Sequence, residues 1–323
     1  MKTWRLTRSR AVRYSGVMQD LENTVTIRRA ELGEQPAALE LVLHDLPVTQ
    51  RAEQAAKLIK EADDGPLLDG LLVAVRRDRL TGAAWARLQP GRTAYVWPPR
   101  LAASEPETTA DGLLRAVIGF CAISDVRLAQ CLVHVRDSAA EQRMLRSGFK
   151  RLTELAYLVS PIKPSAQAQL AAGFELEAYG AANHNRMLAV LERTYDQTAD
   201  CVELNGVRDS EDILAGYRAT GSFNEKHWLL ARAEGRDVGC LLLAEHPAEK
   251  IMELVYMGLV PDVRGRGWGL KLVQTAQHLA RIAECTQIVL AVDARNERAL
   301  RMYEAAAFVD WDRRSVLVKT FDE

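Results

Sequence analysis

Hydrophobic and polar positions in the second half of the chain follow two distinct periods. A period near 3.6 residues predicts helices over 185–197, 210–220, 272–283 and 296–306. Ser210 and Asn296 are the expected N-caps of the second and fourth helices, because their side-chain oxygens can accept hydrogen bonds from the first turn. Apolar runs and two-residue alternation predict strands over 174–179, 228–232, 238–244, 251–260, 288–292, 308–311 and 316–318.

The strand over 288–292 differs from the others because it is apolar without alternation. Such a run is typical of a parallel strand that is covered on both faces. It follows the strand over 251–260 and a predicted helix, so the three elements form a right-handed βαβ unit. The pattern therefore predicts an α/β fold.

Residues 25–160 repeat the same order of elements. An offset of 159 positions aligns Phe149 with Phe308 and Asp137 with Asn296. We infer an internal repeat. The pattern predicts helices over 111–123 and 139–147, and strands over 25–28, 71–75, 83–88, 93–97, 128–135 and beyond Phe149.

Two prolines, Pro161 and Pro164, mark the expected boundary between the halves. Proline lacks a backbone N–H and fixes φ, so neither a helix nor a strand ladder continues through this stretch. The basic N-terminal segment has no apolar region after its charges, so it does not read as a secretory signal. We expect an arm over 1–24, a first domain over 25–160, a linker over 161–172 and a second domain over 173–323.

Composition narrows the class of protein. Of 323 residues, 48% are hydrophobic, and 42 basic against 43 acidic side chains give a net charge of −1. This balance disfavours a nucleic-acid binder, whose affinity comes largely from neutralising phosphates. No run of about 18 apolar residues predicts a membrane span. Five scattered cysteines without a CxxC pair predict neither a disulfide framework nor a metal site, and we expect a cytoplasmic protein.

A glycine-rich turn follows the strand over 251–260. Gly265, Gly267 and Gly269 alternate with other residues, so they permit positive φ and let backbone N–H groups converge without a Cβ in the way. Such a concavity at a helix N-terminus binds anions. Arg264 and Arg266 add charged donors that suit phosphate. The turn therefore predicts a phosphate cradle.

Two familiar phosphate motifs do not fit this turn. A Rossmann fingerprint counted from Gly265 requires a glycine where Leu270 stands. A Walker A motif requires the same glycine and a Ser or Thr where Leu272 stands. Dinucleotide binding and ATP hydrolysis are therefore disfavoured.

The stretch 264–269, with the sequence RGRGWG, resembles the R/Q-x-x-G-x-G/A signature of the GNAT superfamily of N-acetyltransferases. Residues 296–303 resemble the second motif of that family, N-x-x-A-x-x-x-Y. Ala307 stands where the family usually has glycine, which affects the helix C-cap alone. The resemblance covers about 172–323. It implies tandem GNAT-like domains, each with a mixed, mostly antiparallel sheet around a central βαβ unit flanked by helices.

The resemblance also implies a reaction, in which an amine attacks acetyl-CoA directly in a ternary complex. The turn holds the pyrophosphate, and the strand before it splays from 288–292 and bonds the pantetheine arm like an added strand. No metal is implied. The implied coenzyme-binding residues are Met257, Leu259, Val260, Arg264, Gly265, Arg266, Gly267, Trp268, Gly269, Asn296 and Tyr303.

Glu253 matches the carboxylate that serves as base in many members of the family. It interrupts an apolar strand, and burial there would raise its pKa toward a useful value. The alternative is a carboxylate that faces solvent or pairs with an arginine. Tyr303 matches the tyrosine that protonates the coenzyme sulfur. Tyr256 and the loop residues Glu203 and Asn205 are the candidates for contact with the acceptor amine.

The first half lacks both parts of this machinery. No alternating glycines follow the strand over 93–97, and Met144 aligns with Tyr303. We therefore expect a degenerate copy without coenzyme. The chain is also similar to mycothiol synthase, a tandem acetyltransferase that acetylates a cysteinyl amine. A non-catalytic acyl-CoA sensor is the alternative from another class. The sequence does not determine which amine is the acceptor, how long the acyl chain is, or whether the protein is a homodimer.

Overall fold

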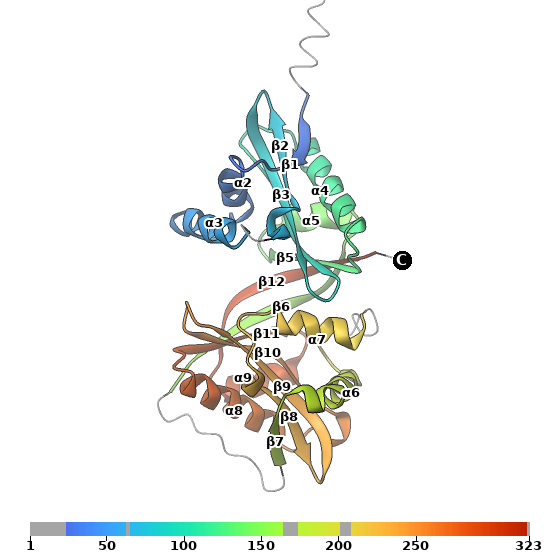
Figure 1. Cartoon of the computed structure of the whole chain (residues 1–323), viewed down its shortest axis with the longest axis vertical. Coiled ribbons are helices and arrows are strands. Elements are labelled where there is room, and N and C mark those ends of the chain that lie inside the picture. The colour runs from blue at the N-terminus through green and yellow to red at the C-terminus, as the bar shows by residue number, and fades with distance from the viewer. Residues whose placement is uncertain (1–23, 63–64, 164–173, 201–207, 322–323) are drawn as a thin grey trace, which may run out of the picture. The chain divides into compact units, whose positions relative to one another are not determined.

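The computed structural model describes residues 24–62, 65–163, 174–200 and 208–321. The chain divides into two compact units. One consists of Met1–Trp85 and Pro99–Val117, and the other of Ala86–Pro98 and Ile118–Glu323. Figure 1 labels the elements along the chain.

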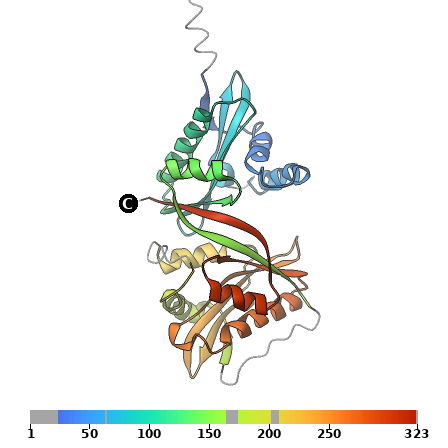
Figure 2. The same ribbon diagram turned by 180° about the vertical axis from the view of Figure 1, so that it is seen from behind.

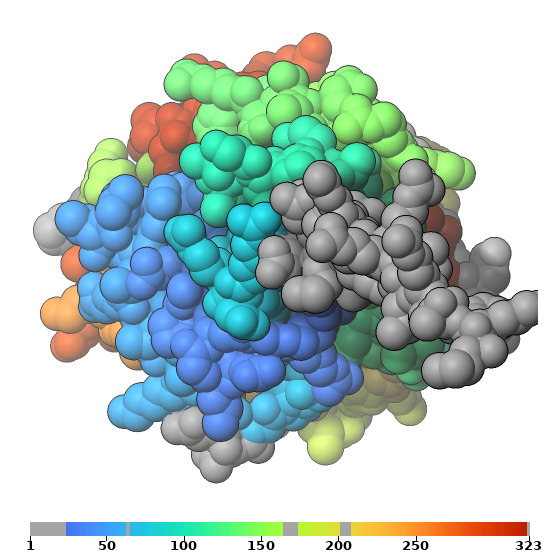
Figure 3. Space-filling view, turned by 90° about the horizontal axis from the view of Figure 1, so that it is seen from above, coloured from blue at the N-terminus to red at the C-terminus, as the bar shows by residue number. Residues whose placement is uncertain are grey.

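The smaller unit contains three antiparallel strands in the order β1-β2-β3. Trp85, Leu39, Leu71 and Leu113 are completely buried in its core. Figure 3 views the blue and cyan surface of this unit. The helices α2 and α3 were not among the predicted elements. The bounds are β1 Thr26–Arg29, α2 Gln35–Val42, α3 Val48–Ala62, β2 Leu71–Arg76, β3 Arg79–Gln89 and α4 Glu107–Ala122, with a 3-10 turn at Pro66–Leu68.

The larger unit contains a sheet in the order β4-β5-β12-β6-β11-β10-β9-β8-β7. Its strands are β4 Thr93–Leu101, β5 Leu128–His134, β6 Lys150–Pro161, β7 Phe174–Ala178, β8 Trp228–Ala233, β9 Arg236–His246, β10 Ile251–Leu259, β11 Gln287–Asp293 and β12 Val309–Thr320. Its helices are α5 Ser138–Arg146, α6 His184–Tyr195, α7 Ser210–Arg218, α8 Trp268–Ile282 and α9 Glu297–Ala305. Short 3-10 turns lie at Ala181–Asn183, Glu225–His227 and Pro261–Val263.

Strands from the two halves of the sequence pair with one another in this sheet. The last strand of the chain, β12, lies between β5 and β6, and β6 lies between β12 and β11 (Figure 2). The boundary expected at 161–172 therefore does not separate two compact units. Strand β6 runs to Pro161, which pairs with Gln287, so the ladder includes the first of the two prolines. The assignment of functions to the two sequence halves stays a prediction.

Most of the predicted elements are present, with local corrections. Asp209, not Ser210, occupies the N-cap position of α7, and its side chain makes no capping hydrogen bond. Asn296 caps α9 as predicted, because its Oδ1 accepts the N–H of Ala299 at 3.1 Å. The two short strands expected over 308–318 form one strand, β12, with bulges that keep it in register with β6.

The core that positions the site lies around β9 and β10, on which α6 and α8 both pack. Buried aliphatic side chains from all four elements fill it, including Leu191, Leu241, Leu254 and Val273. Among the helices of residues 24–62, 65–163, 174–200 and 208–321, none combines the length and hydropathy that crossing a bilayer requires.

Candidate active site

Strands β10 and β11 are parallel neighbours that separate along their length. They pair only at Ile251–Glu253 with Gln287–Val289. Beyond this point β10 remains paired with β9, and β11 remains paired with β6. A bulge between Leu254 and Tyr256 adds to the divergence. The splay expected of this strand is therefore present, and it leaves one edge of β10 without a ladder partner.

A cavity of about 460 Å³ opens at this splay, and we call it the splay cavity. Strand β10 contributes Leu254 to Leu259, and β11 contributes Ala291 and Val292. The glycine turn and α9 form the rest of the wall. From these come Arg264, Gly265, Gly267, Gly269, Leu270, Asn296, Arg298, Ala299, Met302 and Tyr303, and the segment after Thr194 adds Gln197 to Asp200.

The three glycines of the turn are needed for different reasons. Gly265 and Gly267 have φ of +82° and +79°, in the left-handed region where other residues are strained. Gly267 is the N-cap of α8, so the first N–H groups of a 15-residue helix begin there. A Cβ on Gly269 would lie 2.8 Å from the Met302 sulfur. The turn therefore presents backbone donors at a helix N-terminus, as an anion cradle does.

Arg264 does not contribute to this cradle in the way the sequence indicated. Its Nε–H donates to the Leu259 carbonyl at 2.8 Å. Its terminal nitrogens donate to the carbonyls of Thr194, Asp196 and Gln197 at 2.8–2.9 Å. The side chain borders the splay cavity, but its donors are used to tie the C-terminal end of α6 to β10. A cation at a helix C-terminus also complements the helix dipole.

Three other expected coenzyme contacts do not line the splay cavity. Val260 is buried in the core. Trp268 packs against Phe174, with ring centroids 4.9 Å apart. The Arg266 guanidinium lies 5.3 Å from the centroid of the Trp268 ring, on the exposed side of the turn.

Arg298 lines the cavity and was missed. It is exposed, and its guanidinium is 3.2 Å from the position of a Cβ on Gly265. It therefore reaches the cradle from α9 and can supply the charged donor that Arg264 does not. Its place two residues after Asn296, in the second motif, was the signal that could have identified it.

Tyr303 projects from α9 into the splay cavity. Its side chain is buried, and the ring packs against Phe308 at 5.5 Å between centroids. Burial, together with the charge of Asp200, raises the pKa of the phenol above its usual value. The hydroxyl therefore stays protonated near neutral pH, as a proton donor must.

Glu253 lies elsewhere than expected. Its carboxylate is 2.8 Å from Nε2 of His246, and its side chain is 34% exposed. It is not among the residues that line the splay cavity. The side chain on β10 is thus neither deeply buried nor part of the cavity wall. The geometry resembles the paired alternative, with histidine in place of arginine.

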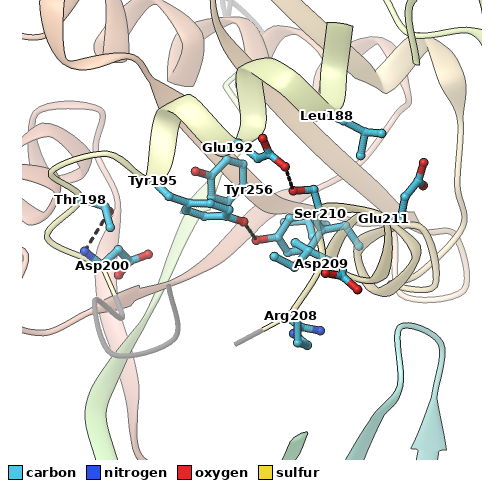
Figure 4. A pocket seen from close by; sticks show the side chains of 13 residues that line it. Leu188, Glu192, Tyr195, Thr198, Asp200, Arg208, Asp209, Ser210, Glu211 and Tyr256 are labelled. Carbon is cyan, nitrogen blue, oxygen red and sulfur yellow. Dashed lines mark hydrogen bonds between the residues drawn. The ribbon is translucent and has the colours of Figure 1, made fainter. Parts of the chain in front are cut away.

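A second cavity of about 730 Å³ lies between α6, α7 and β10, and we call it the tyrosine cavity. Tyr195 and Tyr217 share a hydrogen bond of 3.0 Å, and the Tyr217 ring stacks on that of Tyr256 at 5.4 Å. Figure 4 shows Tyr195 and Tyr256 beside each other. Burial raises the pKa of Tyr195 to about 12, and it raises the pKa of Tyr217 and Tyr256 as well. Glu192, Arg208, Asp209 and Glu211 add charge to the wall.

Only one of the three predicted acceptor contacts is observed in this wall. Tyr256 lines both cavities, and its hydroxyl is 2.8 Å from Oγ1 of Thr194. Glu203 and Asn205 lie outside the described residues. Tyr195 and Tyr217 were missed, because a tyrosine on a helix is more often a core residue.

The two cavities meet along Thr198, Asp200, Val255 and Tyr256, which line both. A ligand in the splay cavity and a ligand in the tyrosine cavity would therefore come into contact at these residues. Within the part of the chain that the structure describes, no group of three His, Cys, Asp or Glu side chains is placed to hold a metal ion.

Comparison with known proteins finds a family likeness for the part of the chain that contains the site. Residues 191–308 match the model of the acetyltransferase (GNAT) family. The matched segment, which contains the glycine turn and Tyr303, is therefore similar to this family.

Solved structures extend the likeness of fold to nearly the whole chain. A GCN5-related N-acetyltransferase from Sphaerobacter thermophilus superimposes with a TM-score of 0.65 at 16% identity, covering 92% of this chain and 95% of that one. A tandem GNAT protein from the clavulanic acid biosynthesis pathway gives 0.56 at 12% identity, covering 93% and 99%. The mixed α/β fold is thus that of tandem GNAT structures.

Curated relatives give a narrower match. The mycothiol acetyltransferase of Streptomyces griseus is 30% identical over 99 residues, which are 31% of this chain and 32% of that protein. The mycothiol acetyltransferase of Paenarthrobacter aurescens is 31% identical over 104 residues, with coverages of 31% and 32%. The chain thus spans about a third of the length of these two relatives.

Proposed function

We propose that this protein is an N-acetyltransferase that moves an acetyl group from acetyl-CoA to a primary amine of a small molecule or peptide. The observation that carries the proposal is the splay cavity. It combines the cradle at the start of α8, the unpaired edge of β10 and the Tyr303 hydroxyl in one space. A thioester carrier with a diphosphate needs these three features together.

Acetyl-CoA fits the residues that are present. Its pyrophosphate suits the N–H groups around Gly265 and Gly267, with Arg298 as the charged partner. The pantetheine amides suit the open edge of β10 in the manner of an added strand. A Cβ on Gly258 would lie 2.6 Å from the Thr194 side chain, so the close packing of α6 against β10 at this point requires glycine. The thioester then lies toward Tyr303 and the junction with the tyrosine cavity.

The tyrosine cavity is the proposed site of the acceptor. When both substrates are held at one junction, the reacting groups no longer have to meet by diffusion. This positioning can lower the activation free energy by about 7–11 kcal/mol. Tyr303 gives its proton to the departing sulfur. Because the cavity carries Glu192, Asp209 and Glu211 against Arg208, a cationic amine is favoured over an anionic acceptor.

A mycothiol-type acceptor is the second candidate. It is supported by the names of the curated relatives, which match about a third of this chain. A cysteinyl amine is cationic, so the charge of the tyrosine cavity also accommodates it. We also propose a cytoplasmic location, in keeping with the supply of acetyl-CoA.

The test measures binding and turnover separately. Isothermal titration calorimetry is expected to show that acetyl-CoA binds to the full chain. Free CoA, which lacks the acetyl group, is the reference ligand. Release of CoA and formation of N-acetyl product are then followed by chromatography with n-butylamine, ethanolamine, putrescine, glucosamine and S-methylcysteine amide. Binding with no turnover of any amine would favour the acyl-CoA sensor. A lack of binding would refute both functions.

A further inference from the structure

Asp200 lies at the junction of the splay cavity and the tyrosine cavity. It is one of the four residues that line both. It comes from the segment that follows α6, and Figure 4 shows it near Thr198 and below Tyr195. Its carboxylate is therefore placed where an acceptor amine would meet the thioester.

The carboxylate is held by one oxygen. The backbone N–H of Asp293, at the end of β11, donates to Oδ1 of Asp200 at 2.8 Å. The Asp200 N–H donates to Oγ1 of Thr198 at 3.1 Å. Within residues 174–200 and 208–321, no hydrogen bond is made to Oδ2. One oxygen thus orients the group, and the other is available to a substrate.

The surroundings of Asp200 suit a group that takes up a proton. Burial is the largest cause of a pKa above the usual value for an aspartate. The charge of Asp200 also contributes to the raised pKa of Tyr303. The carboxylate of Asp200 is thus close enough to influence the ionisation of the Tyr303 phenol.

Glu253, the carboxylate expected from the sequence, occupies a different place from Asp200. It pairs with His246 and lies outside both cavities. Between the two carboxylates, only Asp200 borders the space that also contains Tyr303.

We propose that Asp200 is the general base that accepts the proton of the attacking amine. The proposal rests on the proposed transferase function. The bound ammonium group first releases one proton to bulk water. The neutral amine nitrogen then bonds to the carbonyl carbon of the thioester and becomes positively charged, and its second proton passes to Oδ2 of Asp200. The carbon–sulfur bond then breaks, its electron pair stays on sulfur, and sulfur takes the Tyr303 proton. Transfer of the proton from Asp200 to the Tyr303 phenolate restores both groups, and nothing is oxidised or reduced.

The test is the variant Asp200→Asn, in which the amide oxygen can still accept the Asp293 N–H. With the fastest amine of the panel above, kcat is expected to fall at least 100-fold, within the range for loss of a general base. The Kd for acetyl-CoA and the melting temperature are expected to stay near the wild-type values. Asp196→Asn is the matched control, because Asp196 is exposed and lines neither cavity. It is expected to keep kcat within twofold.

A pH profile separates a base from a structural residue. Wild-type kcat is expected to fall as the pH drops through the raised pKa of Asp200, because the protonated carboxyl cannot accept a proton. Asp200→Asn removes this limb. Burial keeps the neighbouring tyrosines from ionising in this range. Among the residues that the structure describes, the charged and titratable groups around Asp200 are Asp293, Arg295, Tyr195, Tyr256 and Tyr303.

The outcomes are distinct. If Asp200→Asn keeps more than a third of kcat with the acidic limb intact, the proposal for Asp200 is wrong while the transferase function stands. A 100-fold loss in Glu253→Gln with none in Asp200→Asn would return the role to Glu253. A loss of acetyl-CoA affinity or of melting temperature that matches the loss of rate would show a structural role instead. Failure of the wild type to acetylate any amine would refute the transferase function itself.

Discussion

The segment β4-α4-β5-α5 and the segment β10-α8-β11-α9 share a backbone frame and differ in the turn after the first strand. In each, the parallel strands pair over three residues, Thr93–Tyr95 with Leu128–Gln130 and Ile251–Glu253 with Gln287–Val289. In each, the last helix is capped by a side-chain oxygen that accepts an alanine N–H at 3.1 Å. The repeat inferred from the sequence is therefore present in the backbone.

The turns of the two segments are built for opposite charges. Before α4, Glu105 accepts hydrogen bonds from Arg76, and Glu107 stands in the first helical turn. Before α8 there are two glycines at positive φ and no acidic residue in the first turn. Acidic groups at a helix N-terminus occupy the position that an anion would take. The comparison teaches that the frame alone does not make a phosphate site, and it supports the prediction that the first half binds no coenzyme.

The largest expected effect tests the difference between Tyr303 and its counterpart Met144. Tyr303→Phe is expected to lower kcat about 10²–10⁴-fold, because the sulfur loses its proton donor. The Kd for acetyl-CoA should not change. Met144→Tyr is the reciprocal variant, and it is expected to add no activity, because no cradle precedes it. If Tyr303→Phe kept the full kcat, we would conclude that Tyr303 only packs in the core, as Met144 does.

The next effect separates the two arginines of the turn. Arg264→Ala is expected to lower the free energy of unfolding by about 2–3 kcal/mol, because four backbone carbonyls lose a charged donor. Arg266→Ala, on the exposed side, should stay within about 0.5 kcal/mol of the wild type. Urea denaturation measures both. If the two variants were equally stable, the Arg264 contacts would contribute little to the free energy of unfolding. Arg264 would then again be a candidate for binding the coenzyme.

A smaller effect tests the cradle itself. Gly267→Val is expected to weaken acetyl-CoA binding by about 1–2 kcal/mol, because a β-branched residue is strained at a φ of +79° and turns the N–H groups away. Gly235→Val is the control, since Gly235 has a φ of +74° in the turn between β8 and β9 and also has open space around it. Titration calorimetry on both variants distinguishes loss of the cradle from general strain. Equal losses of affinity would contradict the assignment.

The smallest effect compares the C-terminal ends of α5 and α9. Ala307 has a φ of +64°, at the position where the offset of 159 places Gly148 with a φ of +87° in the first half. Ala307→Gly is expected to stabilise the fold by about 0.5–1 kcal/mol, because glycine removes the left-handed strain at some cost in chain entropy. Gly148→Ala should destabilise by a similar amount. A thermal melt of each variant shows the sign.

Much of this site could be predicted because its parts are local in sequence. The glycine turn and the Asn296 cap each depend on neighbours within a few positions, so residue type and spacing were sufficient. Position 307 was singled out only by the family resemblance. The splay of β10 from β11 followed from the family resemblance. The structure differs most from the sequence-based expectations for side chains whose partners are distant along the chain. The sequence predicts that Arg264 binds phosphate, but in the fold its guanidinium donates to the carbonyls of Thr194, Asp196 and Gln197.

The sequence by itself determined the order of the elements in the second half and the glycine turn at the start of α8, since these depend on local backbone preferences and on hydrophobic period. The tertiary structure alone decided that β6 and β12 pair with strands of the other half, and that Glu253 meets His246. It also brought Asp200 to the wall shared by the two cavities, through the N–H of Asp293. Such contacts join positions far apart along the chain, and their free energy depends on burial and geometry that no local pattern records.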